Sequence, residues 1–163
     1  MILVDTSVYI SALADNEVEK MLKEAHNKAF IISSEVIEKE INLASDFLRK
    51  RGKSSDAQKL KDLYNSAISG TIKLTGRVVE LSDKYAKEVS KRISRARALE
   101  MKDDFRIVSS ATIGGIEAVA TFNRKTMANP EIVSIYKEVN STNKLKTPSF
   151  ARTKEELSKL LSA

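Results

Sequence analysis

The chain contains no cysteine and only one histidine, His26. Without cysteine there is no disulfide, no thiolate nucleophile and no Cys-ligated zinc site. One histidine is also too few for a zinc site built from several imidazoles. A catalytic metal would therefore be held by carboxylates and other oxygen ligands, which favour hard ions such as Mg²⁺ or Mn²⁺. We interpret His26, which lies among charged neighbours, as a solvated surface residue.

Long apolar runs are also missing. No stretch approaches the length of a membrane-spanning helix, and the first residues do not show a basic segment followed by an apolar one. We therefore expect a soluble, cytoplasmic protein. A Gly-rich phosphate loop is absent after the first apolar run, which disfavours a nucleotide-binding domain. The 163 residues are enough for one domain, 1–163, with its own core.

Positive charge is concentrated in the middle of the chain. The formal net charge is +6, and Asn42 to Lys102 contains 15 Lys or Arg against 7 Asp or Glu. A basic segment on an otherwise near-neutral domain favours a polyanionic partner, most simply nucleic acid. The ordinary alternative is a solvated basic surface without a nucleic-acid partner.

Short apolar runs alternate with helical patterns along the sequence. The runs predict four strands, at 2–4, 29–32, 78–81 and 118–121, with a further extended piece at 71–74 given little weight. Apolar residues at helical spacing predict helices between them, including 35–48 after the cap residues Ser33 and Ser34 and 104–113 before Gly114. Two further helices are expected, one capped by Ser55 that ends near Gly70, and one capped by Ser82 that continues past Ile93 to Ala96. Alternation of this kind predicts an α/β fold, a three-layer α/β/α sandwich with a parallel sheet.

Acidic and amide side chains fall where such strands end and such helices begin. Because ligands of open parallel sheets bind beyond the carboxyl ends of the strands, we expect these residues to converge on one rim. Crowded carboxylates repel one another, and a divalent cation that relieves the repulsion can activate water and hold a phosphate oxygen. Hydrolysis of a phosphodiester is the reaction that this chemistry favours. The residues are Asp5, Glu35, Glu38, Glu40, Asp103, Asp104 and Asn123.

Each of these residues also has an ordinary structural explanation. Asp5 and Asp103 are suitable helix caps, and acids such as Glu35 are favoured in the first turn of a helix. Asn123 is suitable for a turn. Their joint placement on one predicted rim, rather than any single residue, carries the functional hypothesis.

Three segments resemble the PIN-domain (PilT N-terminus) family, which includes the VapC-like toxin ribonucleases. "ILVDTSVYISAL" resembles the opening strand and first metal-binding Asp of the family, here Asp5. "SSEVIEKEI" resembles its acidic segment and places that role on Glu40, with Glu38 as the alternate. "DDFRIVSSATIGGIEAVATFNRKTM" resembles its Asp, small-residue helix, strand and Thr-x-Asn or Thr-x-Asp, which places the Asp on Asp104, with Asp103 as the alternate.

The resemblance implies a parallel sheet of four or five strands and Mg²⁺- or Mn²⁺-dependent cleavage of RNA. It implies metal binding by Asp5, Glu40 and Asp104, with Asn123 orienting water or a neighbouring ligand. It also implies a homodimer and, for the toxins, an inhibitory protein antitoxin. Predicted substrate contacts are Arg106 and Arg124 near the rim, a helical stripe of Lys84, Lys87, Lys91 and Arg95, and the basic turn 49–53.

One position departs from the family pattern. Many members have an Asp where Asn123 stands, and Asn offers an acceptor oxygen without the charge. This departure favours a second hypothesis, a catalytically weak or inactive PIN-like scaffold that binds RNA or protein in RNA processing. The intact Asp5, Glu40 and Asp104 favour the nuclease.

Overall fold

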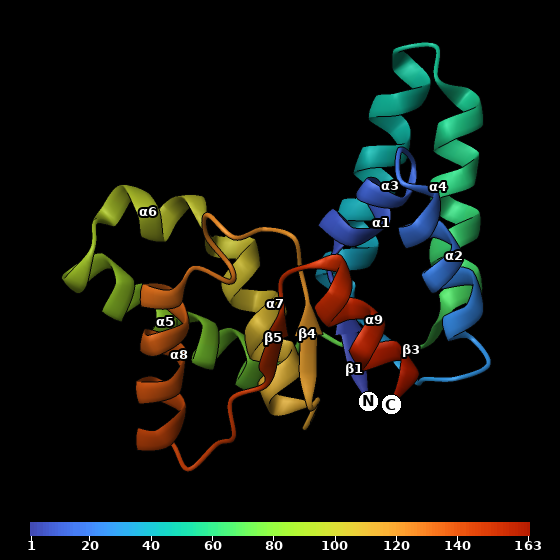
Figure 1. Ribbon diagram of the computed structural model, residues 1–163. Coiled ribbons are helices and arrows are strands. Elements are labelled where there is room, and N and C mark those ends of the chain that lie inside the picture. Colours follow the sequence, from blue (N-terminus) through green and yellow to red (C-terminus); the bar gives the residue numbers. More distant parts are fainter.

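The protein is described by a computed structural model of residues 1–163 (Figure 1). Strands and helices alternate along most of the chain, as the sequence pattern predicts. The elements are β1 (Ile2–Val4), α1 (Thr6–Ala12), α2 (Asn16–Ala25), β2 (Ile31–Ser34), α3 (Glu35–Lys50), α4 (Ser54–Ala67), β3 (Ile68–Ile72), α5 (Gly76–Arg92), α6 (Arg95–Glu100), α7 (Lys102–Ile113), β4 (Ala118–Ala120), α8 (Pro130–Thr142), β5 (Ser149–Ala151) and α9 (Lys154–Ser162).

One five-stranded sheet, in the order β3-β2-β1-β4-β5, forms the centre of the molecule. All neighbouring strands run parallel, with Leu3 of β1 opposite Ile32 of β2 and Val119 of β4. Helices flank the sheet, with α1 to α4 and α9 gathered in one group and α5 to α8 in another (Figure 1). The predicted three-layer α/β/α architecture with a parallel sheet is therefore confirmed.

The apolar runs of the central strands supply the core. Leu3, Val4, Val119 and Ala120 are almost fully buried because helices cover both faces of the sheet. On the α5–α8 side an aromatic cluster fills the space: the rings of Tyr85 and Tyr136 lie 4.8 Å apart. Phe105 packs edge-on against Tyr136 at 6.4 Å.

The third predicted strand is wrong. Residues 78–81 lie in the first turns of α5, whose N-cap is Thr75 and not the expected Ser82. The buried residues of α5 recur at helical spacing: Val78, Leu81, Tyr85 and Val89. The β-branched pair Val78 and Val79 at the start of this helix accounts for the wrong strand prediction. The actual third strand is β3, and Gly70, expected to end a helix, lies inside it.

Several helix boundaries also differ from expectation. Lys53 precedes α4 without a side-chain cap, whereas Ser55 was expected to cap it. The helix expected to continue past Ile93 breaks there, because Ser94 caps a new helix, α6. The Ser34 cap of α3 is confirmed, and Gly115, with φ of +66°, turns the chain after α7.

Strand β1 lies at the point where the order of strand connection reverses. The chain passes from β1 to β2 in one direction along the sheet, whereas β4, on the other side of β1, follows much later. Ligands of open α/β sheets bind at such switch points, beyond the carboxyl ends of the strands. None of the helices is both long and apolar enough to span a bilayer.

Candidate active site

Asp5 directly follows β1, and its side chain contacts Thr121, which directly follows the neighbouring strand β4. Its Oδ2 accepts hydrogen bonds from Ser7 Oγ at 2.6 Å, Thr121 Oγ1 at 2.9 Å and the Ser7 backbone N at 3.4 Å. The side chain is 5% exposed. Oδ1 has no hydrogen-bond partner in the protein. Asp5 is thus both the N-cap of α1 and a carboxylate with one oxygen fixed and one free.

Glu40 reaches the same region from the second turn of α3. Ser34 caps this helix, and the buried residues Val36, Ile37 and Ile41 fix which side of it faces the body of the protein. Glu40 is therefore half-buried at the edge of that face. Thr6 Oγ1 donates a 2.6 Å hydrogen bond to Glu40 Oε2, and Oε1 is left without a partner.

Asp104 completes the group from the first turn of α7. Thr126 Oγ1 donates a 2.6 Å hydrogen bond to Asp104 Oδ2, whereas Oδ1 has no partner in the protein. The side chain is half-buried, next to the fully buried Phe105. In all three carboxyl groups a hydroxyl side chain therefore holds one oxygen and the other remains available.

The electrostatics show that these carboxyl groups are crowded and desolvated. Burial, with added repulsion from Asp5, Asp104 and Asp103, raises the pKa of Glu40 to about 7, although the Thr6 hydrogen bond acts in the opposite direction. Burial, with Asp5, Asp103 and Glu100 adding repulsion, raises the pKa of Asp104 to about 6. Burial also raises the pKa of Asp5, although its hydrogen bonds from Ser7 and Thr121 act in the opposite direction.

No Lys or Arg forms an ion pair with Asp5, Glu40, Asp103 or Asp104, although 13 ion pairs occur elsewhere in the protein. The negative charge of the group is therefore not balanced from within the protein. This chemistry, several oxygen donors without a basic neighbour, fits a hard divalent cation. As the side chains lie here, however, no three acidic groups come close enough together to hold one ion.

Asn123 lies in the turn that follows β4. Its Oδ1 accepts a hydrogen bond from the Thr126 backbone N at 3.2 Å, and its backbone N donates to Thr121 Oγ1 at 3.1 Å. The side chain therefore stabilises the turn that positions both threonines, one bound to Asp5 and the other to Asp104. These contacts agree with the ordinary structural role expected for Asn123, which is to stabilise a turn.

The alternate acids lie differently. Glu38 is exposed on α3, and no hydroxyl group donates a hydrogen bond to it. Glu35 is occupied elsewhere, because its Oε2 accepts a 2.6 Å hydrogen bond from the Leu74 backbone N. Asp103 is exposed but lies near enough to raise the pKa of both Glu40 and Asp104. The geometry thus favours Glu40 over Glu38.

The predicted basic contacts fall in two regions. Arg106 is half-buried on α7, two residues after Asp104, and Arg124 is exposed in the turn after β4. By contrast, Lys84 and Lys87 line a groove of about 390 Å³ between α5 and α8, which contains none of the site carboxylates. Lys84 donates to Asn143 Oδ1 at 2.7 Å. Arg95 is exposed at the start of α6.

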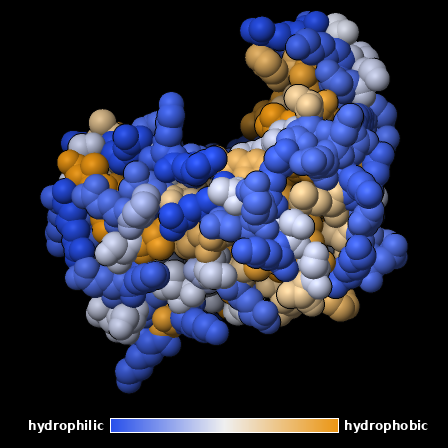
Figure 2. Space-filling view, viewed as in Figure 1, coloured by the Kyte–Doolittle hydropathy of each residue, from blue (hydrophilic) through white to orange (hydrophobic).

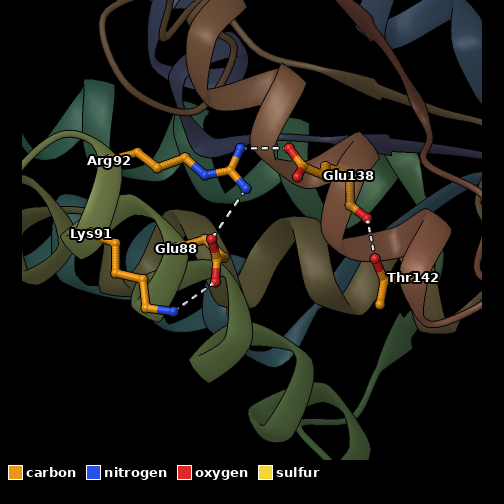
Figure 3. A network of polar contacts seen from close by, with 5 residues as sticks. All are labelled: Glu88, Lys91, Arg92, Glu138 and Thr142. Atoms are coloured by element: carbon orange, nitrogen blue, oxygen red, sulfur yellow. Dashed lines mark hydrogen bonds and ion pairs between the residues drawn. The ribbon is translucent and has the colours of Figure 1, made fainter.

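Ion pairs join α5 to α8 along this groove (Figure 3). Arg92 pairs with Glu138 and with Glu88, which in turn binds Lys91 at 3.4 Å. Thr142 Oγ1 donates to the Glu138 backbone oxygen. Lys91 and Arg92 are thus already matched by acidic groups, a structural arrangement that the helical stripe in the sequence did not reveal.

Sequence reasoning missed the hydroxyl residues that hold the carboxylates. The Thr6 hydroxyl binds Glu40 across 34 positions, and no local pattern marks it. Thr121 entered only as part of a motif, and Thr126 was not singled out. The Thr121 signal was available in the Thr-x-Asn pattern, but nothing in the local sequence distinguishes Thr126 from any other turn residue.

Comparison with known proteins agrees with the fold. A chain in the crystal structure of VapBC2 from Rickettsia felis, bound to a DNA fragment from their promoter, superposes with a TM-score of 0.58. The alignment covers 80% of this chain and 94% of the other, at 18% sequence identity. Similarity at this level supports a PIN-like fold. No protein-family model matches the sequence, and no curated protein matches it either.

Proposed function

We propose that the protein is a metal-dependent endoribonuclease that hydrolyses RNA phosphodiester bonds. The observation that carries the proposal is the group formed by Asp5, Glu40 and Asp104. Each comes from a different element, each has one oxygen held by a hydroxyl group and one free, and no basic side chain neutralises them. They lie beyond the carboxyl ends of the strands, at the switch point of the sheet.

Mg²⁺ or Mn²⁺ would be held by Asp5, Glu40 and Asp104. Such a cation supplies a Lewis acid for a phosphate oxygen and lowers the pKa of bound water. The protein contributes orientation: Ser7 and Thr121 fix Asp5, Thr6 fixes Glu40, and Thr126 fixes Asp104. Donors of this kind, which set the direction of a ligand without binding the metal, are commonly as important as the ligands themselves.

Basic side chains near the carboxylates supply contacts for the phosphates of the RNA. Arg106 and Arg124 are the closest candidates in sequence to the carboxylate group, and we propose that they contact phosphates that flank the scissile one. Such contacts provide affinity that falls with salt but carry no sequence information. The substrate remains RNA as a class.

The resemblance to VapC-like toxins extends the proposal to partners. We propose that the nuclease is a toxin, that a small protein antitoxin inhibits it, and that it acts as a homodimer in the cytoplasm. Support comes from the fold similarity to a chain of a VapBC2 complex and from the three sequence segments described above.

A second candidate function is favoured by two specific observations. Asn123 replaces an acid found in many PIN domains and uses its Oδ1 to hold the Thr126 backbone. The carboxylates, moreover, are not gathered into a closed ion site. Both would suit a PIN-like scaffold that binds RNA or protein without cutting.

Cleavage of a mixed, structured RNA by the purified protein distinguishes the two. The reactions contain Mg²⁺, Mn²⁺ or EDTA, and the variants are Asp5→Asn, Asp104→Asn and the matched surface control Glu38→Gln. A nuclease cuts only with metal, loses cleavage in both Asp variants and keeps it in Glu38→Gln. A folded wild type that cuts nothing with either metal supports the scaffold instead.

A further inference from the structure

Helix α3 carries a stripe of residues that leads away from the candidate site. Glu40, Leu43, Phe47 and Arg51, which follows the last residue of the helix, recur at intervals of three and four and so share one side. Nearer the sheet the same side carries the buried Val36. Farther out, α3 and α4 extend from the body of the protein as a hairpin (Figure 1), and there this side carries the exposed Leu43 and Phe47.

The apolar members of the stripe are exposed. Leu43 is 58% exposed and Phe47 is 55% exposed, and no other large apolar side chain of the α3–α4 hairpin is exposed. In the space-filling view the molecule is hollowed between this hairpin and the lobe formed by α5 to α8 (Figure 2). Apolar colour runs along the side of the hairpin that borders the hollow.

The Phe47 ring is already arranged for stacking. The Arg51 guanidinium lies over one face, 4.5 Å from the ring centroid, and this cation–π contact favours the observed ring position. The other charged groups of the hairpin tip are mostly basic: Arg49, Lys50 and Lys53, with Asp46 paired to Arg49 at 3.5 Å. An exposed aromatic ring among cationic side chains is the combination that binds unpaired nucleotides.

We propose that Phe47 is a stacking platform for an unpaired base of the RNA, a short distance along the strand from the scissile phosphate. The inference rests on the proposed nuclease function, because it places the cut at Glu40 and its neighbours. Phe47 lies seven positions after Glu40, about 10 Å along the helix axis, which is roughly the rise of three stacked bases. Such a contact selects single-stranded over base-paired RNA at that position.

The occupant that the residues favour is a nucleic acid, not a protein. A stable protein interface needs a contiguous apolar centre with few charges. Here two apolar side chains stand between the site carboxylates and a cationic tip, and the aromatic ring carries a guanidinium. The positive charge suits a phosphate backbone, and the ring suits any base, because every base has a π-face.

Fluorescence anisotropy tests the proposal with EDTA present, so that binding is measured without cleavage. The probes are a labelled single-stranded oligoribonucleotide and a fully paired duplex of the same sequence. Phe47→Ala should weaken binding of the single strand about tenfold and leave duplex binding nearly unchanged. Phe47→Trp should bind the single strand as tightly as the wild type. Phe47→Leu keeps apolar area but has no π-face, so it should bind as weakly as Phe47→Ala.

The matched control is Phe30→Ala. Phe30 is 71% exposed, but it directly precedes β2 and so lies at the amino ends of the strands, whereas the candidate site lies at their carboxyl ends. Its removal should therefore not alter the affinity for RNA. Equal affinity of wild type and Phe47→Ala, or full affinity of Phe47→Leu, overturns the stacking proposal. So does a wild-type dimer that Phe47→Ala dissociates in sedimentation while RNA affinity is kept, since the surface would then join two copies.

The proposed nuclease function stands or falls separately. If the wild type cuts RNA and Phe47→Ala both cuts and binds as well as the wild type, only the stacking proposal fails. If the wild type binds single strands through Phe47 but does not cut with Mg²⁺ or Mn²⁺, only the nuclease proposal fails.

Discussion

Thr6 and Glu40, which are 34 positions apart in the sequence, are joined by a 2.6 Å hydrogen bond from Thr6 Oγ1 to Glu40 Oε2. The bond connects the start of α1 to α3 and places the Glu40 carboxyl group beside the end of β1. It also distinguishes Glu40 from the other candidate acid of α3, because Glu38 has no such partner.

Glu40→Gln should lower the rate of metal-dependent RNA cleavage by about 100-fold or more, since a neutral amide replaces the carboxylate that we propose as a metal ligand. Glu38→Gln, two residues away on the same helix, should cleave at the wild-type rate. Initial rates at saturating Mg²⁺ measure both. The assignment is wrong if the two variants exchange these behaviours.

Thr121 is fully buried, and its hydroxyl both donates to Asp5 and accepts from the Asn123 backbone N. Thr121→Val keeps the shape but leaves the Asn123 N–H and one Asp5 interaction unsatisfied, which should cost about 1–3 kcal/mol of unfolding free energy. Urea denaturation measures the cost. The exposed Thr142→Val is the control, with an expected change below about 0.5 kcal/mol. Equal unfolding free energies of the two variants would show that the hydrogen bonds of the Thr121 hydroxyl do not stabilise the fold.

The raised carboxyl pKa values predict a pH dependence of the metal-free protein. In the folded state the pKa of Glu40 is about 7, against 4.5 for the free side chain, and that of Asp104 is about 6, against 3.8. The folded protein therefore binds these protons more tightly than the unfolded chain does. Their contribution to stability is greatest at low pH and is lost as the pH rises through about 4 to 7.

The sharpest readout is the difference between wild type and Glu40→Gln in EDTA. Because glutamine does not titrate, stability of the wild type should fall relative to the variant between pH 5 and 7, the upper part of the window. Thermal melting at several pH values measures this difference. A difference that stays constant over the range would mean that the Glu40 pKa is not raised.

Asn123→Asp introduces an acid at the position where many PIN domains, which this chain resembles, have one. Its carboxylate can still accept from the Thr126 N–H, so the turn should be kept. The added negative charge near Asp104 should tighten Mn²⁺ binding and raise cleavage at low metal concentration. Rates across a Mn²⁺ titration test this expectation. A variant with unchanged metal dependence would indicate that Asn123 acts only in the turn.

The sequence predicted the architecture better than the edges of its elements. Continuous apolar runs such as Ile2 to Val4 reflect burial on both faces of a parallel sheet, and the Ser34 cap is a local interaction. The strand prediction at Val78 and Val79 was wrong because a β-branched pair in the first turn of a helix has the same local pattern as a strand. Only its continuation to Tyr85 and Val89 at helical spacing identifies α5.

The candidate site was predicted as a set of acids but not as an arrangement. Asp5, Glu40 and Asp104 follow from strand ends and from the family resemblance, and the structure brings each into contact with a hydroxyl. Those hydroxyl partners are tertiary contacts: Thr126 meets Asp104 across 22 positions and Thr121 meets Asp5 across 116. No spacing rule in the sequence reports such pairs.

Binding of Mn²⁺ to the purified protein, measured by isothermal titration calorimetry, tests the central claim most directly, because it does not depend on finding the right RNA. We predict that the wild type binds Mn²⁺, and that Asp5→Asn, Glu40→Gln and Asp104→Asn each weaken binding about tenfold or more, as Glu38→Gln does not. Circular dichroism confirms that each variant is folded. A wild type that binds no Mn²⁺, or an affinity that none of the three substitutions changes, would contradict the account.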